Sequence, residues 1–324
     1  MLATVVHNTF KVIKVEVMFK LKFGVGLQLI RMTKDEFIKI IDDYHQHIEY
    51  IYYSSLLDKK YYARKIVSVK EQAKFYEINH ADQYEILEYA RNKYGIKTEL
   101  CVNAYACKSD EDFIKMFEYE IAHHKPDKCV TYNRLVDRLK CIDPSISFEL
   151  SFNEGLLFYD DIDKVSNNFD SIVIGGRFIR DINMINKILM SGRTPNILIN
   201  NGCAFNCGYC GRCDCLKVFD RNLKVSNNDI NIPFAIQTLL PFELYNNDKV
   251  YTDDLYYKLS TRLCNYDELN FLMKSYVNNL NTISNMTEFH AICPLRHFEK
   301  YYNDINMDDV IKYKIRLWDK IGNK

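Results

Sequence analysis

The sequence lacks a long uncharged apolar run. None of its segments approaches the ~18 consecutive apolar residues of a membrane span, so we expect no membrane association. The first 22 residues alternate Val, Ile and Phe with Lys and His, and they lack the continuous apolar core of a signal peptide. We therefore expect a cytoplasmic protein, in which thiols stay reduced by default.

The sequence also lacks a charge imbalance, because its 43 basic residues equal its 43 acidic residues in number. This balance gives no global electrostatic reason to bind nucleic acid. The Gly-x-Ser-x-Gly, His-Glu-x-x-His and Walker patterns are absent, which leaves serine hydrolases, zincin proteases and P-loop enzymes without support. Gly24-Val25-Gly26 lacks the third glycine and the helix start of a dinucleotide-binding turn.

Glycine and proline are scarce, at 11 and 6 residues, and no Pro/Gly/Ser-rich linker divides the chain. What the chain has instead is a repeated alternation of short apolar runs with helical patterns. We expect strands at 19–27, 48–54, 98–104, 128–132, 147–152, 171–174, 196–199 and 255–259. We expect helices after the capping box of Thr33 and Glu36, before Gly95, and at 112–123, 162–168, 182–190 and 266–280, with an insertion or extra helix at 56–80.

About eight strand–helix units predict a closed α/β barrel of the (β/α)8 TIM type, with an open doubly wound sheet as the alternative. We expect the barrel to span residues 1–280. Residues 281–324 are then a short C-terminal helical extension packed on the barrel.

A dense cysteine run follows the apolar stretch Ile197-Leu198-Ile199. It places five thiols within 13 positions, at Cys203, Cys207, Cys210, Cys213 and Cys215. Thiolates are soft ligands, and in a reducing compartment such crowding favours a metal over disulfides. The spacing suits a cysteine-ligated iron–sulfur cluster, while Cys207, Cys210, Cys213 and Cys215 also provide the four ligands of a structural zinc site.

Cys203, Cys207 and Cys210 are the preferred ligands of a 4Fe-4S cluster. The fourth ligand stays open among Cys213, Cys215, Cys264 and Cys293.

The segment Cys203-Ala-Phe-Asn-Cys207-Gly-Tyr-Cys210 resembles the C-x3-C-x-aromatic-C motif of radical S-adenosylmethionine enzymes. That resemblance implies three thiolates on a 4Fe-4S cluster whose open iron binds S-adenosylmethionine. In that family the motif follows the first barrel strand, whereas only residues 216–324 follow it here.

A broader resemblance spans roughly residues 147–276. Ser171-Ile-Val-Ile-Gly-Gly-Arg, Asn196-Ile-Leu-Ile-Asn-Asn-Gly-Cys203 and Tyr257-Lys-Leu-Ser-Thr-Arg262 resemble the collagenase-like peptidase family U-32. This resemblance implies a barrel with cysteines late in the sequence, and a 4Fe-4S cluster that serves hydroxylation chemistry on rings or nucleic-acid bases. Ser260 and Thr261 stand where the family has Glu-Gly, and its His-Gly-Ala-x-x-Cys element is absent.

Three polar residues follow predicted strands at the end where barrel enzymes carry their chemistry. Glu154 is a candidate general acid or base, and Arg177 and Arg180 are candidates to bind a carboxylate or phosphate. We expect an iron–sulfur barrel acting on a small-molecule or nucleotide-like substrate, with a partner subunit or electron donor. The alternatives are a radical enzyme using S-adenosylmethionine and a zinc-binding, non-catalytic scaffold.

Overall fold

The computed structural model describes most of the predicted barrel. It covers residues 21–27, 29, 31–55, 80–103, 109–156, 158–200, 238–261 and 264–280, together with positions 308, 311, 312, 314, 315, 318 and 319. The five clustered cysteines, Cys293 and residues 56–79 of the predicted insertion lie outside the described residues.

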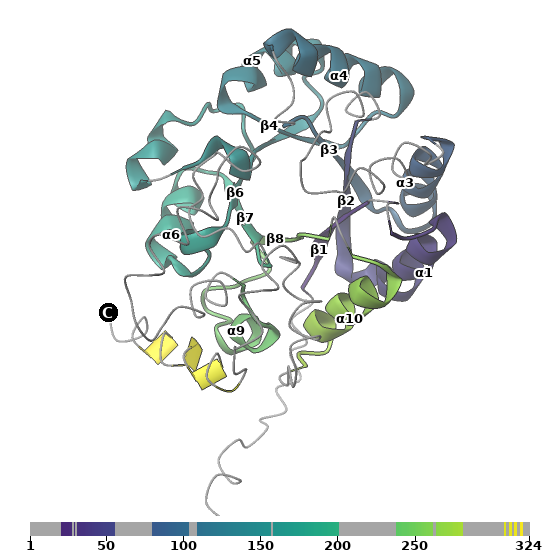
Figure 1. Ribbon diagram of the computed structural model, residues 1–324. Helices are drawn as coiled ribbons and strands as arrows, with labels where there is room; N and C mark the ends of the chain where they lie inside the picture. The colour runs from purple at the N-terminus through teal and green to yellow at the C-terminus, as the bar shows by residue number, and fades with distance from the viewer. Residues whose placement is uncertain are drawn as a thin grey trace, which may run out of the picture.

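Eight parallel strands close into a barrel in sequence order, so the predicted (β/α)8 fold is confirmed (Figure 1). The strands are β1 (Phe23–Gly26), β2 (Ile48–Ser54), β3 (Lys97–Cys101), β4 (Lys128–Thr131), β5 (Ser147–Leu150), β6 (Ser171–Ile174), β7 (Thr194–Leu198) and β8 (Tyr256–Leu259). Closure comes from β1, which pairs with β2 on one side and with β8 on the other, at Gly24↔Lys258.

Helices surround the barrel on the outside (Figure 1). The α-helices are α1 (Lys34–Tyr44), α3 (His80–Tyr94), α4 (Asp110–His123), α5 (Asn133–Ile142), α6 (Ile182–Met190), α9 (Pro241–Asn246) and α10 (Tyr266–Val277). Short 3-10 helices are η1 (His45–His47), η3 (Phe152–Glu154), η4 (Tyr159–Lys164) and η5 (Gly176–Arg180). None of the described helices is long and apolar enough to cross a membrane.

Local signals in the sequence set several helix ends. The Thr33 side chain accepts a hydrogen bond from the Glu36 backbone, and the Glu36 carboxylate accepts from Thr33 N, which completes the predicted capping box of α1. Gly95 follows α3 with a φ of 69°, a left-handed conformation that favours glycine at the end of a helix.

The predicted helix at 162–168 is wrong. The chain instead forms η4 and becomes extended at Val165. Asp161 accepts a hydrogen bond from Phe158 N, and the Ser166 hydroxyl accepts one from Asn168 N. Such local side-chain bonds compete with the helix for backbone groups. Two helices that we did not predict, α5 and α9, are also present.

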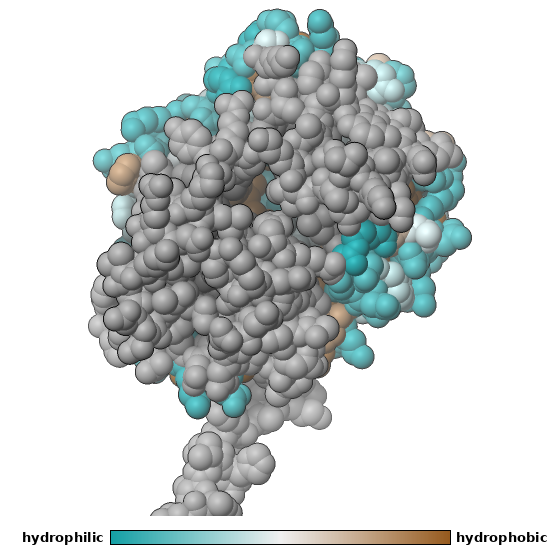
Figure 2. All heavy atoms as spheres, viewed as in Figure 1, coloured by the Kyte–Doolittle hydropathy of each residue, from teal (hydrophilic) through white to brown (hydrophobic). Residues whose placement is uncertain are grey.

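The core has two parts, on opposite sides of the strands. A large apolar cluster includes residues of the strands and of the surrounding helices, such as Ile51, Leu100 and Phe117. A smaller, separate cluster consists of Tyr50, Tyr52, Cys101 and Val130, which alternate along their strands with residues of the large cluster. At the periphery of the view along the barrel, the described residues are mostly hydrophilic (Figure 2). Polar side chains such as Glu99, Glu149 and Asn196 are buried on the same side of the strands as this smaller cluster.

Candidate functional site

The cysteine run is next to β7 in sequence. Cys203 comes five residues after Leu198, where β7 ends. In barrels of this fold the C-terminal ends of the strands form the face that carries function. Among the strands that the structure describes, β1 to β7 precede the run and β8 follows it. In sequence the run therefore follows a strand end at this face, late in the order of strands.

The described residues that flank positions 201–237 lie side by side. Leu239 N donates a hydrogen bond of 2.7 Å to Ile199 O, and Ile199 N donates to Lys258 O of β8 at 3.1 Å. The Asn200 side chain binds both backbone groups of Ser260, accepting from Ser260 N at 2.5 Å and donating to Ser260 O at 3.1 Å. Asn200, the last described residue before the cysteine-bearing segment, is thus held at the end of β8.

Arg180 lies near the other end of this segment. Its guanidinium is buried and binds the Glu243 carboxylate of α9, with an Nη2–Oε1 distance of 2.6 Å. Arg180 Nη2 also donates to Thr238 O at 2.8 Å. These contacts give Arg180 a structural role, and its predicted role in binding an anionic substrate stays a prediction.

Glu154 and Arg177 follow the neighbouring strands β5 and β6. The half-buried Glu154 carboxylate accepts a hydrogen bond of 2.9 Å from Asn133 N, the first backbone group of α5. A carboxylate at a helix N-terminus stabilises the helix by charge as well as by hydrogen bonding. Arg177 is part of η5, and its side chain lies outside the description. The acid/base role of Glu154 and the anion-binding role of Arg177 stay predictions.

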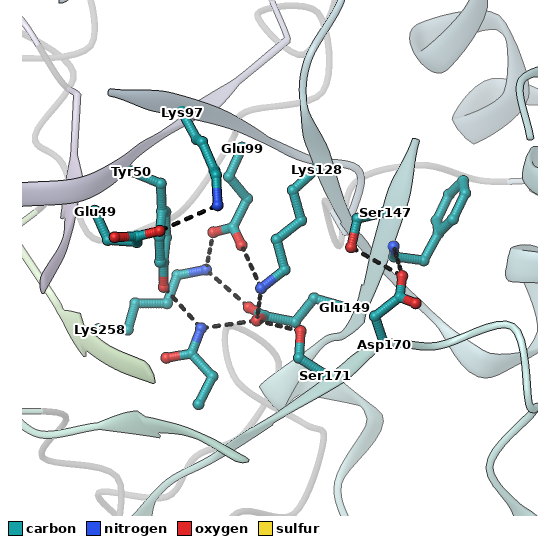
Figure 3. A network of polar contacts seen from close by, with 12 residues as sticks. Glu49, Tyr50, Lys97, Glu99, Lys128, Ser147, Glu149, Asp170, Ser171 and Lys258 are labelled. Atoms are coloured by element: carbon teal, nitrogen blue, oxygen red, sulfur yellow. Dashed lines mark hydrogen bonds and ion pairs between the residues drawn. The ribbon is translucent and has the colours of Figure 1, made fainter. Parts of the chain in front are cut away.

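Four charged side chains meet inside the barrel (Figure 3). Glu99 of β3 and Glu149 of β5 are both fully buried, and the ammonium groups of Lys128 and Lys258 lie between them. Lys128 Nζ is 2.5 Å from Glu149 and 3.7 Å from Glu99. Lys258 Nζ contacts Glu99 and lies 3.3 Å from Glu149. We call these four residues the barrel tetrad.

Polar and aromatic neighbours complete the tetrad. Glu149 Oε2 accepts hydrogen bonds from Ser171 at 2.9 Å and from Asn196 at 2.7 Å, and Asn196 also donates to Tyr50. Aromatic rings lie beside both ammonium groups: Lys128 Nζ is 4.6 Å from the Tyr256 ring centre, and Lys258 Nζ is 4.6 Å from that of Tyr52. Such rings attract a desolvated cation.

The two carboxylates of the tetrad have opposite pKa shifts. Burial and the nearby charge of Glu149 raise the pKa of Glu99 to about 7. Burial disfavours the ionised form of Glu149 as well, but Lys128 and Lys258 outweigh that effect and lower its pKa. Within the described residues, Glu99 Oε1 has no hydrogen-bond partner. The tetrad therefore keeps one glutamate ionised and can hold a proton on the other.

Two glycines make room for the tyrosines beside the tetrad. A Cβ atom at Gly24 would lie 2.1 Å from Tyr50 Cζ, and one at Gly26 would lie 2.5 Å from Tyr52 Cζ. Real Cβ atoms do not approach other atoms so closely, so both positions of β1 require glycine. The Gly24-Val25-Gly26 pattern therefore serves close packing inside the barrel.

Our sequence reasoning did not identify the tetrad. A signal was present, because each of its members lies in a predicted strand next to at least one apolar residue, as in Phe148-Glu149-Leu150 and Tyr257-Lys258-Leu259. Two acidic and two basic residues of this kind predict charge pairing inside a closed barrel, since buried charges are paired. The contacts of Glu243 with Lys314 and Trp318 were also missed, because these residues are far apart in sequence.

Comparison with known proteins adds no family to this picture: no family model matches the chain, and no curated protein matches its sequence. The class of fold rests on the structure, which is a closed barrel of eight parallel strands with helices outside. Among the described residues, no group of three or more His, Cys, Asp or Glu side chains is arranged to hold a metal ion. The candidate metal ligands stay the cysteines of the 203–215 run, with Cys264 and Cys293 as further candidates for the fourth ligand.

Proposed function

We propose that the chain is an iron–sulfur barrel protein that carries out redox chemistry on a small-molecule or nucleotide-like substrate. The observation that carries this proposal is the place of the cysteine run, which follows β7 at the functional face of a closed barrel. Five thiols within 13 positions suit a soft-metal centre. Cys203, Cys207 and Cys210 would hold the 4Fe-4S cluster, which transfers electrons when bound.

Cys264 is the one candidate fourth ligand within the described residues. It lies between α10 and β8, which is the strand that follows β7 in sequence. Its side chain is buried among apolar side chains. Its amide donates a hydrogen bond of 3.1 Å to Thr261 O. Cys213, Cys215 and Cys293 remain the other candidates for this ligand.

The order of strands favours this proposal over a radical S-adenosylmethionine enzyme. In the radical family the motif follows the first barrel strand, whereas here β1 to β7 all precede Cys203. A zinc-binding scaffold remains the alternative from a different class, because the same thiolates suit a tetrahedral zinc site.

Anaerobic purification followed by iron, sulfide and zinc analysis tests the proposal. We expect a brown protein with about four irons and about four sulfides per chain. Cys203→Ala should lose the cluster, while Cys141→Ala is the matched control because Cys141 is an exposed thiol at the end of α5. A colourless protein that holds zinc would overturn the redox proposal in favour of the scaffold.

Single Ala variants of Cys213, Cys215, Cys264 and Cys293 then identify the fourth ligand. One of the four should lose iron as fully as Cys203→Ala. If all four keep the cluster, and S-adenosylmethionine changes its spectrum, the radical-enzyme reading replaces the one proposed.

A further inference from the structure

The barrel interior carries charge where barrels of this fold usually carry bulky apolar side chains. Glu99 and Glu149 reach inward from β3 and β5, and Lys128 and Lys258 reach inward from β4 and β8 (Figure 3). Buried ions cost free energy unless hydrogen bonds satisfy their donors and acceptors. Part of the barrel tetrad is not satisfied in this way, which points to a further partner.

The unsatisfied groups lie at Lys128 and Glu99. An ammonium group has three N–H donors, and Lys128 Nζ uses one of them within the described residues, at 2.5 Å from Glu149 Oε2. Glu99 Oε1 is buried and has no hydrogen-bond partner among these residues. The two atoms are 3.7 Å apart, which is too long for a hydrogen bond between them. We call Lys128 Nζ and Glu99 Oε1 the open pair.

Solvent reaches the tetrad beside Lys128. The side chains of Glu99 and Glu149 are 0% exposed, whereas that of Lys128 is 11% exposed. Tyr256, whose ring centre is 4.6 Å from Lys128 Nζ, is half-buried. Lys128 and Tyr256 are the first residues of β4 and β8, so this access lies at the N-terminal end of the strands. It is the end opposite to the one that the cysteine run follows in sequence.

The charge of the tetrad decides what the open pair can bind. The set is neutral when all four members are ionised, so a buried monoanion needs one compensating proton. A proton on Glu99 Oε1 makes that oxygen a donor beside the unused N–H groups of Lys128. A carboxylate can then accept a hydrogen bond at each of its two oxygens, and the interior stays neutral. Phosphate carries nearly two charges at neutral pH and would leave one of them uncompensated.

The surroundings of Glu99 make its protonation available near neutral pH. Burial and the charge of Glu149 raise the pKa of Glu99 to about 7, although Lys258 and Lys128 oppose this shift. The titratable side chains around Glu99 are Tyr50 and Tyr52 of β2, Cys101 of β3, Lys128 and Cys129 of β4, Glu149 of β5, and Lys258 of β8.

We propose that the open pair is a binding site for a small monocarboxylate, which enters the barrel from the N-terminal end of its strands together with one proton. The proton comes from solvent and is carried on Glu99 Oε1, and no covalent bond forms or breaks. The proposed iron–sulfur function and this site are independent, because the site contains no residue of the cysteine run. Either of the two can fail without the other.

Isothermal titration calorimetry of the full chain with acetate, in chloride-free buffer at pH 6 and pH 8, tests this inference. Glu99 is protonated in about nine-tenths of the free molecules at pH 6 and in about one-tenth at pH 8, so the apparent Kd should be about ten-fold weaker at pH 8. Titrations in two buffers of different ionisation enthalpy should show uptake of about one proton per acetate at pH 8. Acetamide has a similar shape without the charge and should not bind.

Glu99→Gln is the decisive variant, because it keeps the size of the side chain. Lys258 donates to Oε2, so the amide nitrogen takes the place of Oε1 and imitates the protonated acid. This variant should bind acetate at pH 8 about ten-fold more tightly than wild type does, without proton uptake. Glu49→Gln is the matched control: Glu49 pairs with Lys22 and Lys97 outside the tetrad, so the wild-type pH dependence should remain.

Lys128→Met removes the ammonium donors and should abolish acetate binding. Several results would overturn the site: no saturable binding of acetate at pH 6, equal affinity of wild type at both pH values, or a Glu99→Gln variant with the pH dependence of wild type. Chloride is the second probe, and binding of chloride as tight as that of acetate would overturn the assignment to a carboxylate. Where Lys128→Met does not fold, Glu99→Gln still decides the question.

Discussion

At the scale of single residues, the barrel tetrad shows how a charged interior is tolerated. Each carboxylate lies between two ammonium groups, and the set of four is neutral when all its members are ionised. A buried ion pair adds little over an apolar core, but removal of one partner is costly because the other charge stays buried. The tetrad is therefore sensitive to any single substitution.

Lys258→Met is expected to lower the free energy of unfolding by about 3–5 kcal/mol, because Glu99 and Glu149 then share Lys128 alone. Lys97→Met is the matched control. Lys97 is 3.1 Å from Glu49 but its side chain is 58% exposed, so its loss should cost about 0–1 kcal/mol. Urea unfolding of both variants measures the difference, and equal costs would contradict the role assigned to the tetrad.

The raised pKa of Glu99 predicts a pH dependence of stability. The folded state binds the Glu99 proton more tightly than the unfolded state does, so stability should fall as the pH rises from about 4.5, the ordinary pKa, through about 7. Glu99→Gln cannot titrate and should flatten this part of the profile. Urea unfolding of wild type and variant between pH 4.5 and 8 tests the prediction, which fails if the two profiles run parallel.

At the scale of elements, Glu154 of one strand–helix unit caps the helix α5 of the unit before it. Glu154→Ala removes the acceptor of Asn133 N at the start of α5 and should lower the free energy of unfolding by about 0.5–2 kcal/mol. Glu154→Gln keeps an acceptor oxygen and should retain part of that stability. If Glu154→Ala unfolds at the same urea concentration as wild type, the carboxylate does not stabilise α5.

The sequence predicted the elements whose signals are local. Each barrel strand overlaps one of the predicted strand segments, and the capping box at Thr33 and Glu36 marks the start of α1. The sequence did not predict η4, where the side chains of Asp161 and Ser166 bind nearby backbone groups. It also missed α5, whose first backbone group is bound by Glu154 from the following strand–helix unit. The tetrad and the Glu243 contacts depend on which strands become neighbours, and no local pattern states that.

At the scale of the whole molecule, the C-terminal residues and the barrel should unfold together. Trp318 is the only tryptophan of the chain, and it contacts Tyr251 and Glu243. Its fluorescence therefore reports on the C-terminal contact, while far-ultraviolet circular dichroism reports on the barrel. We expect the same urea midpoint from both signals, as in a cooperative transition. A fluorescence change at lower urea would show that the C-terminal residues detach first.

The hydrogen bond between Ile199 O and Leu239 N has a consequence for how such a molecule can be altered. The 37 residues from 201 to 237 leave and rejoin the barrel at adjacent points. A short turn can connect such points, and insertions with neighbouring ends are the kind that folded proteins exchange most readily. The barrel is in this sense a scaffold, and the cysteine-bearing segment is an exchangeable insertion. Excision of residues 201–237, or their transfer to another barrel, would then separate the ability to fold from the metal binding that we propose for the cysteine run.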